Sequence, residues 1–471
     1  MNSTYFFYDL ETSGLNPRAD RIMQFAGQRT DMNLTPIGEP VNLLVKLTDD
    51  ILPSPEALLV TEISPQQTVQ DGISEVELAR IFTEEIATPN TIVVGYNNVR
   101  FDDEFIRHTL WRNFRDPYEW SWSDGRSRWD LLDVVRLVRA LRPNGIKWPI
   151  VDGKATNRLE YLSKENKLEH THAHDALSDV EALIGVARLL KSEQPKMYDY
   201  LLKLRDKKEV AALINLDNPQ PFVYASGRYS AEFEKTTVAL PVAPGRKPGS
   251  VLVYDLRFSP DDFANLSESE IAKKINATYE ERKEAGFVPL PVKELQYNRC
   301  PAVAPMGVLD ESAQERLGLD LVKLEENFGE LRKNRGLVDR IAAAWATRPD
   351  FPKNPDIEGQ LYDSFTPDSD KPKISTVRNA NAEDLADLNP NFTDERLSEL
   401  LFRYKARQFP ESLSETEHQR WEELKTAKFQ QELPGYMQRL AQLAAATSDP
   451  SKQFILEEIQ LWVESVMPIA D

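Results

Sequence analysis

The chain of 471 residues is too long for a single hydrophobic core and predicts two to four domains. Its 41% hydrophobic and 28% charged residues are ordinary for a globular protein, and no run of about 18 uncharged apolar residues predicts a membrane span. The net charge of −19 excludes a uniformly basic surface, although it allows a basic path on one face because a binding groove is local.

The first 192 residues alternate strand and helix signals, as a three-layer α/β domain does. Residues rich in β-formers predict strands over 5–10, 22–30 and 41–47, which would form a meander. Helical periodicity follows over 75–87, and a short strand over 91–96 comes next. Further helices are predicted over 102–114, 129–141 and 175–191.

The pattern changes after about residue 195. Short strand-like runs separated by Gly, Pro and Asn predict a small β-barrel-type domain, interrupted by a helix over 266–284 and followed by helical sequence over 311–346. The Pro- and Asp-rich segment 347–373 is typical of a linker, and 379–471 is almost all helical in pattern. We therefore predict domains over 1–192, 195–347 and 350–471.

The first candidate site lies at the end of the first predicted strand. Asp9 and Glu11 are two residues apart, so their side chains point to the same face while Leu10 turns into the core. Two adjacent acids are unfavourable unless a cation neutralises them, and oxygen-only ligands suit Mg²⁺ or Mn²⁺. The alternative is that the strand simply ends at an exposed edge.

A second acidic group follows the strand over 91–96, in the run GYNNVRFDDEFI. Asp102 and Asp103 stand where a helix is predicted to begin. Either residue could be a metal ligand, and either could instead cap the helix by accepting hydrogen bonds from its unpaired N–H groups. We expect the capping role for one of the two.

The third group is the run HTHAHDALSD, which holds three of the five histidines. His174 is followed five residues later by Asp179, which would lie just past the first turn of the predicted helix over 175–191. A zinc site is disfavoured, because Cys300 and the two histidines elsewhere have no spacing that suits zinc. His170 and His172 are expected to be solvated.

Taken together, Asp9-x-Glu11, Asp102 after NNVRF, and His174 with Asp179 resemble the DEDDh exonuclease family. The runs GYNNVRFDDE, SRWDLLDV, LRPNGIKWP and AHDAL extend this resemblance to the bacterial exonuclease I family, over the whole chain. The resemblance implies a ribonuclease H-like exonuclease domain, then an SH3-like domain with inserted helices, then an all-helical C-terminal domain. It also implies processive 3′→5′ degradation of single-stranded DNA to 5′-mononucleotides, in repair and recombination.

The resemblance further implies two Mg²⁺ ions, about 4 Å apart, that bind the scissile phosphate. Asp9 would bridge both ions, Glu11 and Asp179 would complete the first, and Asp102 would hold the second. His174 would take the proton from the attacking water, which suits imidazole near neutral pH. Mn²⁺ is expected to substitute for Mg²⁺.

Aromatic and basic residues suggest where a single strand would lie. Five of the eight tryptophans stand within 111–148, and 100–142 hold nine arginines against eight acids. Aromatic faces stack on unpaired bases for about 1–3 kcal/mol each, and arginines follow phosphates. The exonuclease I resemblance implies DNA contacts by Arg107, Tyr118, Trp122, Arg136, Arg142 and Lys207, and it places Arg158 with Glu11 at the terminal nucleotide. Trp111 and Trp129 are expected to be core residues.

Outside the catalytic region, the basic stretch LFRYKARQFP at 401–410 is a candidate DNA contact in an otherwise acidic tail with 13 Lys/Arg against 23 Asp/Glu over 350–471. The family resemblance implies a monomer that binds the acidic C-terminal tail of single-stranded DNA-binding protein. A single cysteine and a first segment without a basic stretch favour a cytoplasmic location. Two alternatives stay open, namely an RNA-trimming DEDDh enzyme and a catalytically inactive single-strand-binding protein.

Overall fold

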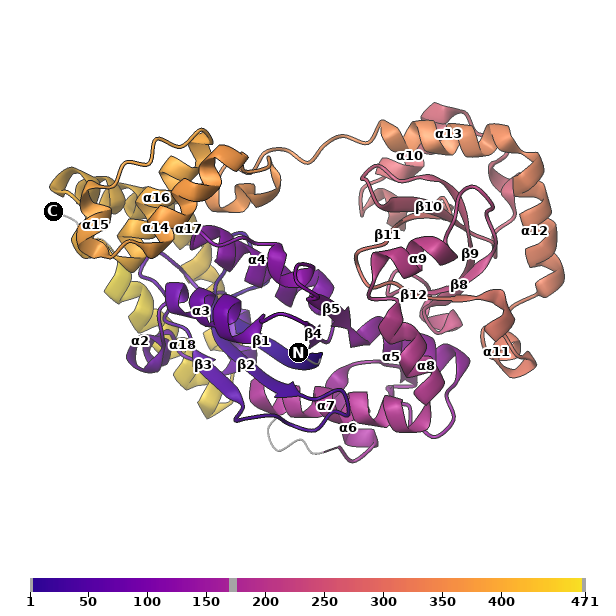
Figure 1. The fold of residues 1–471 in the computed structure, drawn as a ribbon, viewed down its shortest axis with the longest axis horizontal. Coiled ribbons are helices and arrows are strands. Elements are labelled where there is room, and N and C mark those ends of the chain that lie inside the picture. Colours follow the sequence, from indigo (N-terminus) through magenta and orange to yellow (C-terminus); the bar gives the residue numbers. More distant parts are fainter. Residues whose placement is uncertain (1–2, 169–175, 468–471) are drawn as a thin grey trace. The chain divides into compact units, whose positions relative to one another are not determined.

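The computed structural model describes residues 3–168 and 176–467, which form two compact units (Figure 1). The first unit contains residues 3–127, 176–181 and 352–467, and the second contains 128–168 and 182–351. The C-terminal residues therefore pack with the N-terminal ones, although the whole second unit separates them in the chain.

The first unit is built on a sheet whose strands lie in the order β3-β2-β1-β4. Their bounds are β1 Thr4–Thr12, β2 Ile22–Thr30, β3 Val41–Leu44 and β4 Thr91–Gly95. The first three strands pair antiparallel, as the predicted meander requires, and β4 pairs parallel with β1. β3 is shorter than predicted, because Val45 leaves the ladder and forms an isolated parallel bridge with Ile73.

Alternation along β1 separates its apolar side chains from its acidic ones. Phe6, Tyr8 and Leu10 join a buried cluster with residues of β2, of α3 (Glu75–Ile81) and of α4 (Asp102–Arg112). Because successive side chains on a strand point to opposite faces, Asp9 and Glu11 point away from this cluster, as predicted. The predicted helix over 75–87 is confirmed, but its last turn widens into a π-helical turn over Phe82–Ile86.

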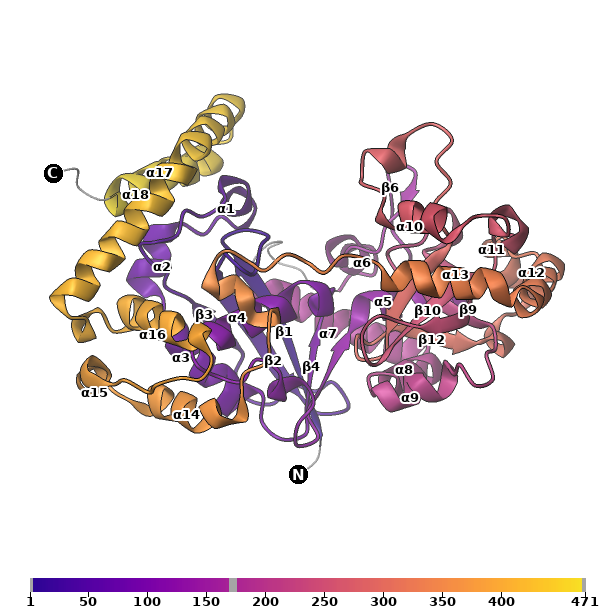
Figure 2. The same cartoon turned by 90° about the horizontal axis from the view of Figure 1, so that it is seen from above.

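The C-terminal part of this unit is helical, as predicted. Its helices are α14 Lys371–Asn379, α15 Ala382–Asp387, α16 Glu395–Gln408, α17 Glu415–Ala446 and α18 Pro450–Val466. In both Figure 1 and Figure 2, α17 and α18 lie side by side, and α18 packs against α1 (Pro55–Thr61) and α2 (Pro65–Asp71). An apolar cluster that includes Met23, Leu58 and Ile459 fills this contact.

Buried ion pairs join the C-terminal part to the N-terminal strands. Glu358 is 2% exposed, and it accepts hydrogen bonds from Arg21 at 2.7 Å and from Arg407. Arg407 also donates to Asp50 at 2.7 Å. Burial alone would raise the pKa of the Asp50 and Glu358 carboxyls, but the surrounding cations, Arg407 foremost, hold both pKa values well below their usual range.

The ion pairs bear on two sequence predictions. The linker predicted over 347–373 is wrong for its second half, where Ile357–Tyr362 and Asp368–Asp370 form 3₁₀ turns and Glu358 is buried. The basic stretch 401–410, a candidate DNA contact, has three of its cations paired within the first unit. Arg403, Lys405 and Arg407 pair with carboxylates of the same unit at Asp356, Glu417 and Asp50.

The second unit holds a sheet of strands in the order β11-β10-β9-β8-β12. Their bounds are β8 Phe222–Ala225, β9 Thr236–Pro244, β10 Ser250–Asp255, β11 Val292–Gln296 and β12 Ala302–Pro305. The sequence did not predict β12, a short strand that contains Pro305 and follows Pro301. Proline lowers the strand signal and is tolerated at a sheet edge, where β12 lies.

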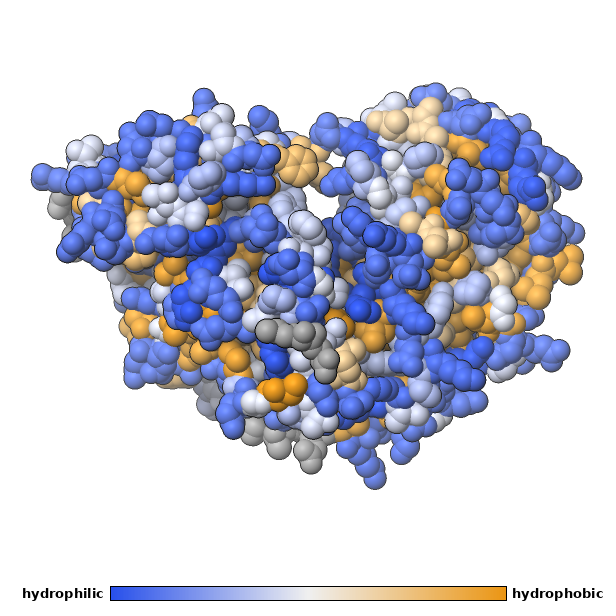
Figure 3. Space-filling view, in the orientation of Figure 1, coloured by the Kyte–Doolittle hydropathy of each residue, from blue (hydrophilic) through white to orange (hydrophobic). Residues whose placement is uncertain are grey.

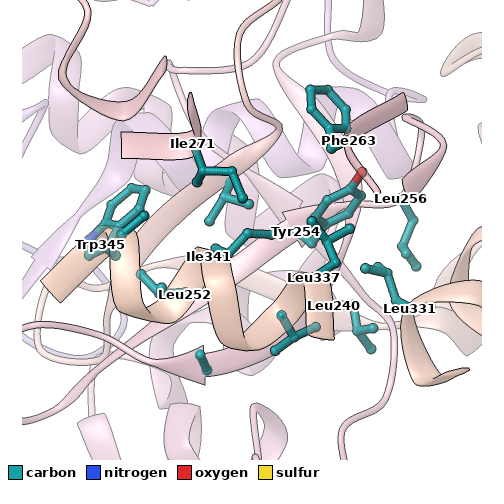
Figure 4. Close-up of a cluster of buried hydrophobic side chains, with 14 of the residues drawn as sticks. Leu240, Leu252, Tyr254, Leu256, Phe263, Ile271, Leu331, Leu337, Ile341 and Trp345 are labelled. Carbon is teal, nitrogen blue, oxygen red and sulfur yellow. The ribbon is translucent and has the colours of Figure 1, made fainter. Parts of the chain in front are cut away.

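Helices cover this sheet and share one core with it. The helices that follow β9 and β10 in the chain are α10 Glu268–Asn276, α11 Glu311–Arg316, α12 Leu321–Lys333 and α13 Arg335–Ala346. Leu252 and Tyr254 from β10 meet Ile271 from α10 and Ile341 and Trp345 from α13 in one buried cluster (Figure 4). The predicted small β domain with inserted helices is therefore present.

The other elements of the second unit precede this sheet in the chain. They are β5 Ser127–Asp130, α5 Leu131–Leu141, β6 Ile150–Val151, β7 Lys154–Ala155, α6 Leu159–Glu165, α7 Ala176–Glu193, α8 Pro195–Lys203 and α9 Lys207–Leu213, of which β5 and α7 begin in the first unit. The helix predicted over 129–141 begins later than expected, because Trp129 and Asp130 end β5 and Asp130 accepts the capping hydrogen bond from Leu132 N.

Hydrophilic side chains cover most of the face shown in Figure 3, as the charged composition predicts. Trp111 and Trp129 are buried core residues, as expected. Among the described helices, none is both long enough and apolar enough to span a bilayer.

The buried ion pairs predict a strong effect of Glu358→Ala on stability. The change removes the 2.7 Å partner of Arg21 and leaves Arg407 with Asp50 alone, so buried positive charge loses its compensation and we expect the free energy of unfolding to fall by about 3–5 kcal/mol. Urea denaturation measures the loss. Glu56→Ala is the matched control, because Glu56 also pairs with a C-terminal helix through Arg439 but is exposed, and it should cost less than about 1 kcal/mol. Equal losses in the two variants would contradict the interpretation.

Candidate active site

Three of the predicted metal ligands lie together in the first unit. Asp9 and Glu11 come from β1 and Asp179 comes from the first turns of α7, and one carboxylate oxygen of each lies within 4.8 Å of the others. Each of the three residues is half-buried. Residues 170 positions apart in the chain are thus brought to one point, as the sequence analysis predicted.

The position of β1 excludes the alternative of an exposed strand edge. β1 lies between β2 and β4, and β2 pairs with it through Glu11. β4 pairs with β1 only as far as Phe7, and the chain then turns through Asn97, with φ 68°, toward α4. This turn places the start of α4 beside the acidic end of β1.

Asp102 and Asp103 begin α4, and the structure gives them different surroundings. Asp103 is completely buried and accepts a hydrogen bond of 2.7 Å from the Tyr8 hydroxyl. Asp102 is the charge that acts most strongly on Asp9. The expected capping role is wrong for both, because the N-cap residue is Phe101, which makes no side-chain capping hydrogen bond.

The electrostatics of the site fit a divalent cation. Burial raises the pKa of the Asp9 carboxyl well above its usual value, and repulsion by Asp102, Glu11 and Asp179 raises this pKa further. Several carboxylates around one point oppose folding unless positive charge neutralises them. An all-oxygen donor set of this kind suits Mg²⁺ or Mn²⁺, so the residues present fit the predicted cofactor.

The predicted base, His174, lies outside the described residues, as do His170 and His172. Of the other two histidines, His108 is buried in α4 with its Nδ1 3.2 Å from the carbonyl oxygen of Glu358. Burial, with the Arg112 guanidinium nearby, lowers the pKa of His108 to about 3, so its imidazole is neutral at neutral pH. His108 is thus a core residue.

Two of the three predicted DNA-contacting residues of the first unit, Arg107 and Tyr118, contact each other, and Arg107 lies five residues along α4 from Asp102. The Arg107 guanidinium lies over the Tyr118 ring at 5.6 Å and donates to Glu104 at 3.1 Å. Trp122 is 66% exposed. Tyr362, whose ring centroid is 6.4 Å from that of Tyr118, has no signal in the sequence, because its segment has the proline and aspartate content typical of a linker.

The other predicted contacts belong to the second unit. They are Arg136 and Arg142 on or after α5, Arg158 before α6, and Lys207 at the start of α9. Arg158 and Lys207 are exposed, whereas Arg142 donates to the carbonyl oxygen of Val308 at 2.9 Å. Their part in DNA binding stays a prediction.

The chain matches three known families along its length. The matches are the Exonuclease family over 6–187, the Exonuclease I SH3-like domain over 205–347 and the Exonuclease I C-terminal domain over 355–466. An exonuclease domain that collects carboxylates at the end of its central strand defines the chain as a nuclease. The predicted fold class is confirmed, namely a ribonuclease H-like domain, an SH3-like domain and a helical C-terminal domain.

Known relatives match nearly the full length. Exodeoxyribonuclease I of Haemophilus influenzae is 38% identical, over 96% of this chain and 96% of its own. The crystal structure of E. coli exonuclease I with a dA16 oligonucleotide has a TM-score of 0.96 and 36% identity, over 99% of this chain and 100% of that one. A zinc-bound form of the E. coli complex with single-stranded DNA has a TM-score of 0.95, with the same identity and coverage. The chain belongs to the exonuclease I family.

Repulsion among the acids predicts that Asp9→Asn stabilises the metal-free protein. Asparagine keeps the shape of aspartate without its charge, so the free energy of unfolding in EDTA should rise by roughly 0.5–2 kcal/mol. Urea denaturation measures it, and exposed Glu39→Gln is the control, with an expected change within about 0.5 kcal/mol. A lower stability of Asp9→Asn would contradict the repulsion.

Proposed function

We propose that this chain is a single-strand-specific 3′→5′ exodeoxyribonuclease that acts processively and releases 5′-mononucleotides. The observation that carries the proposal is the meeting of Asp9, Glu11 and Asp179 within 4.8 Å in a chain of the exonuclease I family. A role in DNA repair and recombination follows from the same family resemblance.

The proposed cofactor is a pair of Mg²⁺ ions, with Mn²⁺ as a substitute. Asp9, Glu11, Asp179 and Asp102 would hold them, and the oxygen-only donor set supports this choice. When bound, such ions neutralise the scissile phosphate, lower the pKa of a bound water and stabilise the leaving oxygen. Zinc in the related E. coli complex supports binding of a divalent ion, and we assign magnesium from the ligand chemistry.

The protein's own residues supply proton transfer and substrate binding. His174 is the proposed general base that takes the proton from the attacking water. Arg107, Tyr118 and Trp122 would bind the strand near the acids. Glu11 and Arg158 would hold the terminal nucleotide, and the remaining proposed DNA contacts are Arg136, Arg142 and Lys207.

The wider proposals concern organisation and partners. We place the domain boundaries at 1–192, 195–347 and 350–471, which lie near the matched family ranges. The partners are single-stranded DNA and the acidic C-terminal tail of single-stranded DNA-binding protein. We expect a cytoplasmic monomer, in keeping with the single Cys300.

The proposed function is tested by incubating 3′-labelled single-stranded DNA, duplex DNA and RNA with the protein, in Mg²⁺ or in EDTA. Mononucleotides should appear from single-stranded DNA in Mg²⁺ alone, and Asp9→Ala should abolish their release. Equal release from RNA would favour the RNA-trimming alternative. Binding of single-stranded DNA without release would favour an inactive binding protein.

The proposed base predicts a selective defect in His174→Ala. Loss of general-base catalysis should lower kcat by roughly 10²–10⁴-fold, because proton transfer contributes about this much. Binding of labelled single-stranded DNA, measured by fluorescence anisotropy in EDTA, should be unchanged. His172→Ala, in the same run, is the matched control and should keep nearly normal turnover. Normal turnover of His174→Ala would remove the proposed base.

A further inference from the structure

Asp103 is an acidic residue next to the cation site to which the proposed mechanism gives no role. Its side chain is 0% exposed, and its Oδ1 accepts hydrogen bonds from Tyr8 Oη at 2.7 Å and from Asn98 Nδ2 at 3.0 Å. Tyr8 and Asn98 are also buried. Burying a carboxylate costs free energy, and the hydrogen bonds from Tyr8 and Asn98 offset part of that cost.

The hydrogen bond from Tyr8 to Asp103 links two adjacent residues of β1 to two adjacent residues of α4. Tyr8 directly precedes Asp9 on β1, and Asp103 directly follows Asp102 on α4. Asp103 is bound by Tyr8, and Asp102 is the charge that acts most strongly on Asp9. Tyr8 and Asp103 are thus held together by a hydrogen bond, whereas Asp9 and Asp102 repel each other unless a cation lies between them.

The start of α4 depends on these bonds because it has no side-chain cap at Phe101. The preceding turn is shaped to deliver Asn98 to Asp103. Asn97 adopts a left-handed conformation with φ 68°, and a Cβ added to Gly95 would lie 2.5 Å from the Cβ of Asn98. A residue larger than glycine at position 95 would therefore displace Asn98.

We propose that Asp103 is a positioning residue that, held by Tyr8 and Asn98, fixes the start of α4 so that Asp102 reaches the cation site of Asp9. The inference rests on the proposed function. Without the hydrogen bonds from Tyr8 and Asn98 to Asp103, repulsion between Asp102 and Asp9 would push α4 away from β1 in the metal-free protein. Each cation would then have to restore the geometry as it binds, which lowers its affinity.

The test removes the Tyr8 hydroxyl, which donates to Asp103, and measures cation binding directly. In Tyr8→Phe, the dissociation constant for Mn²⁺, measured by EPR titration of the full chain without DNA, should rise roughly 10–100-fold, as for other residues that orient ligands. The Mg²⁺ concentration for half-maximal hydrolysis should rise in parallel, while kcat at saturating Mg²⁺ stays near the wild-type value. Tyr5→Phe removes another buried hydroxyl from β1, and it should change neither quantity.

Two variants of Asp103 distinguish a positioning role of this residue from direct binding of the cation. They also provide a test if the Tyr8→Phe protein does not fold. Asp103→Asn can still accept from Tyr8 and should bind Mn²⁺ nearly as tightly as the wild type, whereas Asp103→Ala should bind it much more weakly. Equal loss in both Asp103 variants would make Asp103 a ligand and overturn the inference, as would unchanged Mn²⁺ affinity in Tyr8→Phe. A wild-type protein that neither binds Mn²⁺ nor cleaves DNA would instead overturn the proposed function.

Discussion

The constraint on which this structure depends is the mutual repulsion of carboxylates that must occupy one place. Asp9, Glu11 and Asp179 come within 4.8 Å of each other, and the charge of Asp102 acts on the same point. Residues that repel do not assemble themselves, so the surrounding fold must hold them. The apolar face of β1, on which Phe6, Tyr8 and Leu10 are buried, supplies that support directly beneath the acidic face.

Helix α4 connects the acids to the rest of the first unit. Its first turn carries Asp102, and Arg107 lies about five residues, or roughly 7.5 Å, further along. Its last turns carry His108, which contacts the Glu358 backbone, and Arg112, which donates to Glu75 at 2.7 Å. Because a helix is stiff over this length, residues of the C-terminal part of the chain that contact one end of α4 also support Asp102 at its other end.

The sequence predicted those parts that depend on local patterns. The period of two in β1 was enough to place Asp9 and Glu11 on one face, and the family resemblance singled out Asp102 and Asp179. The role of Glu358 could not be predicted, because its partners Arg21 and Arg407 are distant in the chain and its own segment is rich in proline and aspartate. The sequence also predicts a helix cap at Asp102 or Asp103, because acids are common at the start of a helix and the hydrogen bond from Tyr8 to Asp103 comes from 95 residues away.

Other misses also have local causes. Trp129 fits the apolar period of the following helix as well as it fits a strand, so the boundary between β5 and α5 was placed too early. Tyr362 belongs to no motif, and only its contacts in the fold, with Tyr118, Arg107 and Glu104, connect it with the residues near the acids. Side chains that act through long-range contacts leave no signal in the sequence around them.

The acidic net charge of −19 bears on how such a protein binds a polyanion. In the first unit, cations such as Arg21 and Arg407 are bound to buried carboxylates, so they do not offset this charge at the surface. Long-range attraction to phosphates is then weak, and short-range interactions have to hold the strand. Under the proposed function, stacking on Tyr118 and Trp122 would be one such interaction. The cation site would be the other, because four carboxylates repel a phosphate until divalent ions neutralise their charge. Under the proposed function, the ions therefore decide whether a phosphate can enter the site as well as how it reacts.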